Sequence, residues 1–314
     1  MITRMPRVAE RVRTGLRPRR RFRLATRRAR LLPSFLIIGA QRAGTTSLFD
    51  SLRQHPDIVG PTAGEKLVLL RKEVHFFDLR FSEGVEWYRS FFPLSVHRRL
   101  ARLRGRDLLA GESTPYYLFH PEVPRRVAAT LPDVKLIALL RDPVERAYSH
   151  HQHRVRAGRE ELSFEDALAA EAERLAGGDE LIDSDPRYRR HHFHRAYFAR
   201  GLYADQLERW LACFPRGQLL VLRAEDFFER PGDAYAEVLA FLDVRPWHLD
   251  EHSPRNRASY APLDASLRAE LEARYAEPNA RLAKLLGRDF GWGTEAGVSE
   301  KGAPGAAVSV RRGS

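Results

Sequence analysis

The chain has 314 residues, of which 43% are hydrophobic, so it can form one large packed α/β domain and is not a globally disordered protein. Its formal net charge of +12 is typical of a nucleic-acid-binding protein only if the charge is spread over the fold. Residues 1–32 alone carry twelve arginines against one acid, Glu10. The rest of the chain is therefore close to neutral, and no nucleic-acid partner is expected.

The cellular compartment is indicated by two absences in the sequence. Cys213 is the single cysteine, so no internal disulfide can form, which favours a reducing compartment. No apolar run approaches the roughly 20 residues of a membrane span, and Leu31 to Ala40 is short enough for a buried strand. We expect a cytoplasmic protein, either free or peripheral to the inner face of the membrane.

The two ends of the chain differ in composition from its body. Apolar residues recur at three- and four-residue intervals in the arginine-rich start: Ile2, Met5, Val8, Val12 and Leu16. This pattern permits a basic amphipathic helix on an anionic membrane surface, and the alternative is a solvated, partly disordered tail. The expected organisation is a basic extension over 1–32, one domain over 33–293, and a Gly-, Ala- and Ser-rich disordered tail over 294–314.

Unbroken apolar runs alternate with helical patterns through the body of the chain. The runs lie at 35–38, 108–110, 136–140 and 219–222, and the helical patterns at about 44–55, 121–131, 143–157, 201–213, 231–243 and 264–286. Runs without polar alternation are typical of parallel strands that are buried on both faces. The sequence therefore predicts an α/β, P-loop-like three-layer fold with a central parallel sheet flanked by helices, and a ligand beyond the carboxyl ends of its strands.

The first predicted strand runs into a glycine-containing loop and then a helix. Two glycines five residues apart, Gly39 and Gly44, let backbone N–H groups converge on an anion, and the helix adds its positive end. Thr45 stands where the nucleoside-triphosphate loop has its lysine, so ATP hydrolysis is not expected. The ligand-free alternative is a plain strand-to-helix turn. The predicted phosphate ligands are Gln41, Arg42, Ala43, Gly44, Thr45, Thr46 and Ser47.

A second anion site is predicted where the strand 136–140 ends. Arg141 can grip a phosphate bidentately there, and Ser149 follows two turns along the next helix. The alternative is an Arg–Asp pair that only caps the helix. Two anion sites at two strand ends indicate a nucleotide phosphorylated at two positions, such as the sulfuryl donor PAPS (3′-phosphoadenylyl sulfate), whose product is PAP. No metal is required, and the histidines His191, His192 and His194 lack a metal-ligand spacing.

These motifs resemble the PAPS-dependent sulfotransferase superfamily, and most closely the branch of the heparan sulfate glucosaminyl N- and 3-O-sulfotransferases with their bacterial relatives. The resemblance covers about 34–292. It lies in four segments in the same order: Phe35–Ser47, Glu73–Asp78, Leu139–Ser149 and Tyr275–Trp292. It implies a sulfotransferase whose acceptor is a carbohydrate, a glycolipid or another small hydroxyl-bearing molecule.

The resemblance also implies roles for individual residues. The family's catalytic glutamate falls on Glu73 and its loop lysine on Arg42, while Arg141 and Ser149 hold the 3′-phosphate. A nucleotide-closing loop corresponds to Arg255, Asn256, Arg257, Ala258 and Ser259, and a further nucleotide-side segment to Arg200 and Tyr203. On the acceptor side it implies Lys72, Glu73, His75, Phe76 and Ser113.

Two departures from the family pattern argue against heparan sulfate itself as the acceptor. Ser113 replaces the family's second lysine, and the C-terminal disulfide of the animal enzymes has no cysteine pair. The mechanism expected is in-line displacement with Glu73 as general base, with His75 as the rival base and a structural ion pair as the non-catalytic alternative. Three other functions stay open: a PAP-binding relative without turnover, a P-loop nucleotide kinase, and a non-enzymatic nucleic-acid binder that uses the Arg-rich extension.

Overall fold

The structure of the chain is a computed structural model. It describes residues 21–61, 73–249 and 260–293. Several predictions therefore lie outside the described residues: those for residues 1–20, Lys72, the segment Arg255 to Ser259, and the tail 294–314.

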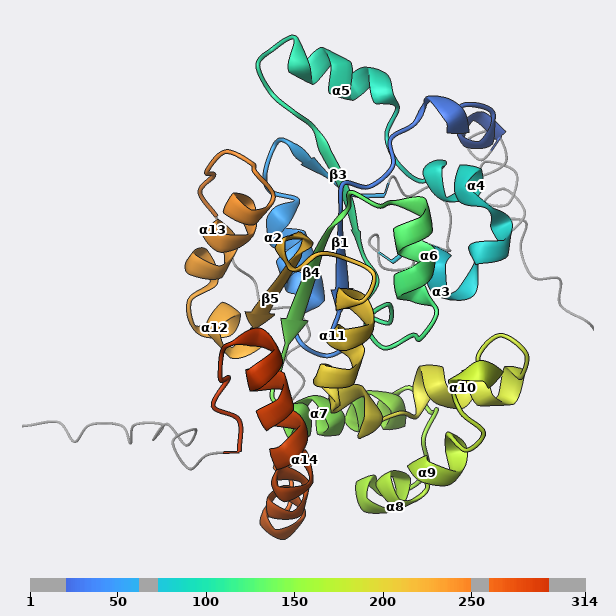
Figure 1. The fold of residues 1–314 in the computed structure, drawn as a ribbon, viewed down its shortest axis with the longest axis vertical. Helices are drawn as coiled ribbons and strands as arrows, with labels where there is room; N and C mark the ends of the chain where they lie inside the picture. The colour runs from blue at the N-terminus through green and yellow to red at the C-terminus, as the bar shows by residue number, and fades with distance from the viewer. Residues whose placement is uncertain (1–20, 62–72, 250–259, 294–314) are drawn as a thin grey trace, which may run out of the picture.

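Five parallel strands form one sheet with the order β2-β3-β1-β4-β5 (Figure 1). They are β1 (Phe35–Gly39), β2 (Ile58–Val59), β3 (Leu109–Ser113), β4 (Lys135–Leu140) and β5 (Leu219–Arg223). All five residues of β1 are buried, as its unbroken apolar run predicts. The four predicted strands are confirmed within a few residues. The sequence did not predict β2, because two residues at a sheet edge are too few to show a pattern.

The helices that follow the strands begin and end close to the predicted limits. The predicted ones are α2 (Thr45–Leu52), α6 (Val123–Thr130), α7 (Pro143–Arg156), α11 (Tyr203–Leu211), α13 (Pro231–Phe241) and α14 (Ala265–Leu286). Shorter helices were not predicted: α3 (Phe76–Leu79), α4 (Val85–Arg89), α5 (Ser95–Arg102), α8 (Phe164–Ala169), α9 (Glu171–Arg174), α10 (Pro186–His194) and α12 (Ala224–Glu229). Most of these have one or two turns, which is too short for a clear period of 3.6 residues.

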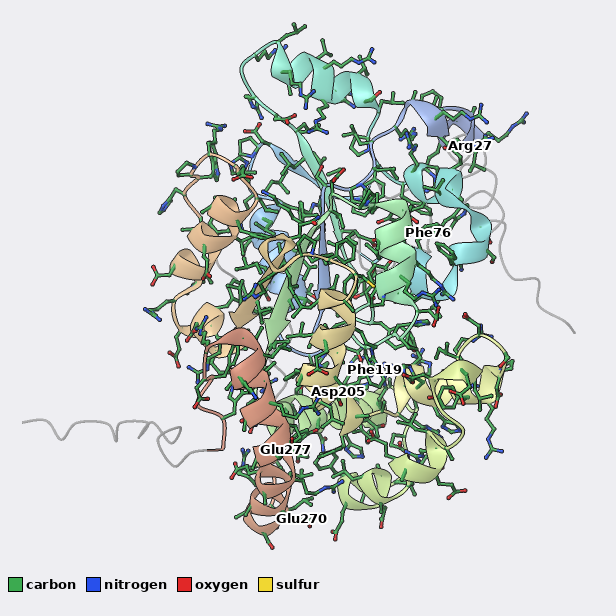
Figure 2. All side chains as sticks on the ribbon, in the orientation of Figure 1. Arg27, Phe76, Phe119, Asp205, Glu270 and Glu277 are labelled. Atoms are coloured by element: carbon green, nitrogen blue, oxygen red, sulfur yellow. The ribbon has the colours of Figure 1, made fainter. Side chains whose placement is uncertain are left out.

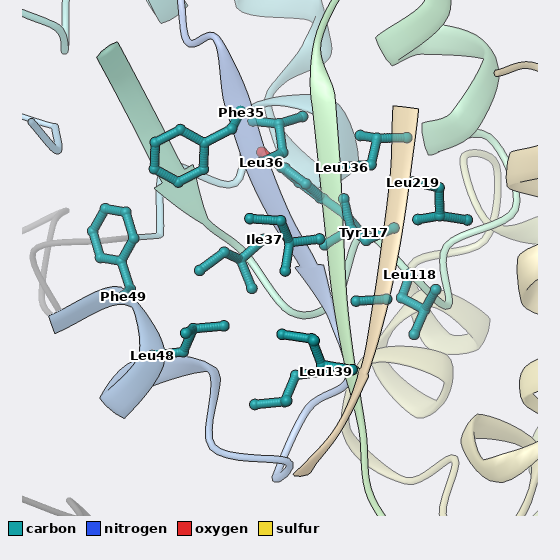
Figure 3. Packing of buried hydrophobic residues seen from close by; sticks show 14 of the residues in the cluster. Phe35, Leu36, Ile37, Leu48, Phe49, Tyr117, Leu118, Leu136, Leu139 and Leu219 are labelled. Carbon is teal, nitrogen blue, oxygen red and sulfur yellow. The ribbon is translucent and has the colours of Figure 1, made fainter. Parts of the chain in front are cut away.

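Helices cover both faces of the sheet. In Figure 1, α2 and α13 lie on one side, α6 and α11 lie on the other, and α14 packs against α11. Figure 3 shows Leu48 and Phe49 of α2 packing on the strand β1, whereas Tyr117 and Leu118 lie on its other side. The predicted α/β fold with a central parallel sheet flanked by helices is confirmed.

The strand order places the reversal of the sheet at β1. From β1 the chain crosses to the edge strand β2 and returns to β3, which lies beside β1. It then passes to β4 and β5 on the other side of β1. Ligands of such sheets bind beyond the carboxyl ends of the strands at this point. The loops that follow β1 and β4 are therefore neighbours. Of the helices in the described ranges, none combines the length and the apolar character that crossing a membrane requires.

Candidate functional site

The loop between β1 and α2 has the backbone shape of an anion-binding turn. Arg42 and Gly44 adopt positive φ angles of 73° and 93°. A side chain at Gly44 would also meet the ring of Phe228, 2.7 Å from the position of a Cβ atom, so glycine is required twice over. The first turn of α2 leaves N–H groups without partners inside the helix, and these point beyond the end of β1.

Arg141, at the end of β4, is held from several directions. Its Nη1 donates to the carbonyl oxygen of Arg42 at 3.3 Å, and its Nη2 donates to Glu145 at 3.2 Å. The Tyr203 hydroxyl donates to the Arg141 carbonyl at 2.8 Å. The next residue, Asp142, caps α7 by accepting the N–H of Glu145 at 2.9 Å. Both the backbone and the guanidinium of Arg141 are thus fixed against the β1 loop.

The two predicted anion motifs contact each other. The Arg42 Nε donates to the Ser149 Oγ at 3.2 Å, although the two residues are 107 positions apart in the sequence. Burial, followed by the charges of Arg141 and Arg156, lowers the pKa of Arg42, and Tyr260 opposes this. A bound anion would stabilise the charged form of an arginine whose charged neighbours are other arginines.

Arg200 contacts the β1 loop through the side chain of Gln41. Its side chain is buried, donates to the Gln41 side chain, and also donates to the carbonyl oxygens of His192 and Phe193 at 2.7 and 2.8 Å. Its guanidinium carbon lies 4.9 Å from the ring centroid of Tyr116. Burial lowers the pKa of Arg200 to about 9. The residue that was predicted to bind nucleotide therefore contacts the loop through Gln41.

In the segment that was predicted to face the acceptor, three polar residues form a chain of hydrogen bonds. His75 binds the Asp78 Oδ2 through Nδ1 at 2.6 Å and the Glu73 Oε2 through Nε2 at 3.1 Å. Burial alone would lower the pKa of His75, but the carboxylates of Asp78 and Glu73 outweigh it and raise the pKa to about 10. His75 is therefore protonated at neutral pH and donates from both nitrogens, so it orients the Glu73 carboxylate.

A buried carboxylate, Glu112, fixes the backbone beside Glu73. Its Oε2 accepts the N–H of Val74 and the Thr114 hydroxyl, both at 3.0 Å. Its Oε1 accepts the hydroxyls of Tyr88 at 2.5 Å and Tyr117 at 3.1 Å. Burial raises the pKa of Glu112 to about 7, against the pull of these donors. No role for Glu112 was predicted from the sequence, although a glutamate directly after the apolar run 108–110 was a signal for one.

We expect the variant Glu112→Ala to be unstable, by about 3 kcal/mol, because it leaves the buried Val74 N–H without an acceptor. Glu112→Gln keeps one acceptor oxygen, and the hydroxyl partners can turn, so its stability should be close to that of the wild type. Denaturant unfolding at several pH values measures both.

Because the folded pKa of Glu112 is raised, the wild type should lose stability relative to Glu112→Gln as pH rises from about 4.5 to about 7. Equal pH profiles would contradict this reading of Glu112.

Positive charge accumulates along the face of α7 beyond Ser149. Arg154 is buried and its Nε donates to the His150 Nε2 at 3.1 Å. Burial and the neighbouring arginines lower the pKa of Arg154 to about 10 and that of His153 to about 4. His194 responds in the same way, with a pKa of about 3. Arg154, which lies five residues after Ser149 in the same helix, was not predicted from the sequence.

Several other predictions are refined by burial. His150, His151 and His192 are buried, and the ring of His192 stacks on that of Phe119. Phe76 and Ser113 were predicted to contact the acceptor, but both are buried as well, and Phe76 stacks on Tyr88. Trp247, although a large apolar side chain, is 38% exposed. Across the residues that the structure describes, no group of three or more His, Cys, Asp or Glu side chains is arranged to hold a metal ion.

Comparison with known families gives a match over most of the chain. The sulfotransferase domain family matches residues 32–256. The chain is 28% identical to the membrane-associated sulfotransferase kil1 of Dictyostelium discoideum, over 83% of this chain and 66% of that protein. It is 31% identical to the mouse bifunctional heparan sulfate N-deacetylase/N-sulfotransferase 3, over 82% of this chain and 30% of that protein. The chain therefore spans two thirds or less of the length of these relatives.

A solved structure agrees with the family match. The crystal structure of a sulfotransferase from Alicyclobacillus acidocaldarius superposes with a TM-score of 0.59 and 34% sequence identity. The alignment covers 83% of this chain and 98% of that one.

Proposed function

Because the chain belongs to the sulfotransferase domain family, we propose that it transfers a sulfuryl group from PAPS to a hydroxyl or amine of an acceptor. The observation that carries the proposal is the contact between Arg42 and Ser149, with a 3.2 Å hydrogen bond. It joins the loop after β1 to the helix after β4, as binding of one nucleotide with two phosphorylated ends requires. Burial and the charges of Arg141 and Arg156 lower the pKa of Arg42, and a bound anion would oppose this effect.

The donor would lie with its 5′-phosphosulfate on the N–H groups of the β1 loop and the first turn of α2. Its 3′-phosphate would bind Arg141 and Ser149. In the proposed reaction, the acceptor oxygen or nitrogen bonds to sulfur while the bond from sulfur to the phosphate oxygen breaks. The electron pair leaves on the phosphate of PAP, where Arg42 and the loop N–H groups stabilise the negative charge.

Glu73 is our proposed general base. It would take the acceptor proton, and the alternative base, His75, is disfavoured because its raised pKa leaves both ring nitrogens protonated at neutral pH. The hydrogen bonds from Asp78 through His75 to Glu73 support a division of roles, in which His75 and Asp78 position the Glu73 carboxylate. An ion pair with only a structural role would need none of this orientation.

For the acceptor we propose an anionic carbohydrate or glycolipid. Arg154 carries positive charge beside the Glu73 segment, since the charge of Glu73 acts on it, and the arginines around His153 and His194 lower the pKa values of both histidines. Such positive charge favours substrates that carry sulfate, phosphate or carboxylate groups. The mouse relative named above is a heparan sulfate N-deacetylase/N-sulfotransferase, which supports the carbohydrate class.

Titration calorimetry with PAP tests the donor site directly. We expect the wild-type chain to bind PAP and Arg141→Ala to bind it roughly tenfold to a hundredfold more weakly, since a charge-assisted bidentate contact is lost. Arg53→Ala, an exposed arginine at the end of α2, is the matched control. Absence of PAP binding by the folded wild type would contradict the proposal.

Turnover is a separate measurement from PAP binding. Labelled PAPS incubated with a panel of glycans, glycolipids and simple alcohols reports transfer. PAP binding without transfer to any acceptor would instead favour a nucleotide-binding relative that has lost turnover. The nucleotide kinase is disfavoured because Thr45 stands in place of the lysine that such enzymes use on the β- and γ-phosphates.

A further inference from the structure

The helix α5 presents an apolar stripe to solvent. Val96, Leu100 and Leu103 follow one another at intervals of four and three residues, so they lie on one face of the helix. Leu103 comes directly after α5 and keeps helical backbone angles of −62° and −17°. These side chains are 46%, 49% and 84% exposed, respectively. A helix of a globular protein normally turns such a stripe toward the core.

The opposite face of α5 is polar and makes hydrogen bonds to neighbouring segments of the chain. Asp107 receives hydrogen bonds from Arg98 at 2.7 and 2.9 Å and from Arg102 at 3.1 and 3.2 Å. The Ser95 hydroxyl donates to the carbonyl oxygen of Ala29 at 2.9 Å. The polar face of α5 thus makes hydrogen bonds within the chain, whereas its apolar face is exposed to solvent.

The start of the described chain lies at the same end of the molecule. Arg30 donates to the carbonyl oxygen of Phe92 at 2.7 Å and pairs with Leu94 in an isolated β-bridge. Phe22 is 57% exposed there. Figure 2 shows Arg27 at this end, whereas Phe119 lies toward the opposite end of the structure.

The charge around this apolar stripe is positive. Residues 95–106 contain five arginines and no acid, and residues 21–30 contain another five and no acid. In the described part of the chain, no acidic side chain pairs with Arg99 or Arg104, which flank the stripe. The twenty residues that precede Arg21 carry seven arginines and one acid. Apolar side chains flanked by arginines are typical of helices that lie in the headgroup region of an anionic membrane.

We propose that α5, together with residues 21–30, forms a docking surface for a membrane with anionic headgroups. Leu100, Leu103 and Phe22 would enter the boundary between headgroups and acyl chains, while the arginines contact lipid phosphates. Nucleic acid could bind the same arginines through its phosphates, but its charged backbone would not bury an exposed stripe of aliphatic side chains.

This surface would hold the catalytic edge away from the membrane. Residues 21–33 precede β1 and α5 precedes β3, so both lie at the amino ends of the parallel strands. The Arg42 and Arg141 loops lie at the carboxyl ends. In Figure 1, α5 and α7 accordingly occupy opposite ends of the structure. A docked molecule would keep its catalytic edge open to the aqueous phase.

Vesicle co-sedimentation with the full chain tests this inference. We expect binding to vesicles of phosphatidylcholine with phosphatidylglycerol, weakening with salt, and little binding to pure phosphatidylcholine. The variant Leu100→Ser/Leu103→Ser keeps every charge and should bind about tenfold or more weakly, because the apolar contribution is lost. The control Val155→Ser/Leu162→Ser removes two comparably exposed apolar side chains, 41% and 38%, elsewhere on the molecule and should bind like the wild type.

Three outcomes would overturn the proposal. Unchanged vesicle binding by Leu100→Ser/Leu103→Ser would assign the attraction to the arginine charges alone. Failure of the wild type to bind anionic vesicles would remove the surface altogether. Retention on DNA with no preference for vesicles would identify a nucleic-acid-binding patch. Matching thermal unfolding curves for the two double variants and the wild type ensure that a loss of binding does not reflect misfolding.

Discussion

Glu73→Gln is expected to lower kcat by a factor of about 100 to 10,000 at saturating donor, which is the usual contribution of a general base. The amide is close in shape to the carboxylate, and its oxygen can still accept the hydrogen bond from His75 Nε2 that is now 3.1 Å long. It cannot take a proton from the acceptor. The loss should therefore appear in turnover and leave the affinity for PAP unchanged, because Glu73 has no proposed contact with the nucleotide.

Glu83→Gln serves as the matched control for Glu73→Gln. Glu83 is an exposed glutamate ten residues along the chain, and its substitution should leave kcat unchanged. Wild-type turnover by Glu73→Gln would dismiss Glu73 as the base.

The pH profile gives a second readout of the same group. His75 has a pKa raised to about 10, so its protonated form and the contacts it makes persist below that pH and disappear above it. We expect kcat of the wild type to fall as pH rises toward about 10.

Arg42→Ala is expected to lower kcat by a factor of about 100 to 1,000, comparable to the removal of one donor from an oxyanion site. The guanidinium is the group that joins the β1 loop to Ser149, and it is positioned to stabilise the charge that builds on the leaving phosphate. Affinity for PAP should also fall, since the same side chain contributes to binding.

The lysine variant separates charge from proton donation. Arg42→Lys retains a positive charge, and an ammonium can donate a proton that a guanidinium does not release. We expect Arg42→Lys to recover most of the turnover lost in Arg42→Ala, and to equal or exceed the wild type if proton donation to the leaving group limits the rate. Arg53→Ala again provides the control for removal of an arginine close to this loop. Full activity in Arg42→Ala would contradict the role that we assign to the loop arginine.

The local sequence predicted the parts of the site that depend on short segments. A buried strand, two glycines five residues apart and a following helix can be recognised in Phe35 to Ser47, because strand burial and backbone turns leave a pattern within a dozen residues. Arg141 at the end of β4 could be found for the same reason. The parallel arrangement of the strands then implied that both segments lie at one edge of the sheet, and the strand order confirms this.

The sequence was less informative about burial of polar side chains. His150 and His192 look like surface residues in chains rich in arginine, and both are buried. Glu112 accepts four hydrogen bonds, and two of the donors, Val74 and Tyr88, lie 38 and 24 residues away in the sequence. A polar residue is found in the interior only when partners meet it there, and those partners come from other elements of the fold.

What the sequence by itself determined is the alternation of strands and helices, the glycine-containing loop after the first strand and the charge of the basic extension, since each follows from neighbouring residues. The tertiary structure alone decided that Arg42 meets Ser149, that Arg200 supports Gln41 across 159 residues, and that α5 turns its leucines outward. The physical reason is that side-chain periodicity defines which face of an element is apolar. The packing of distant elements defines what that face, or a buried charge, will touch.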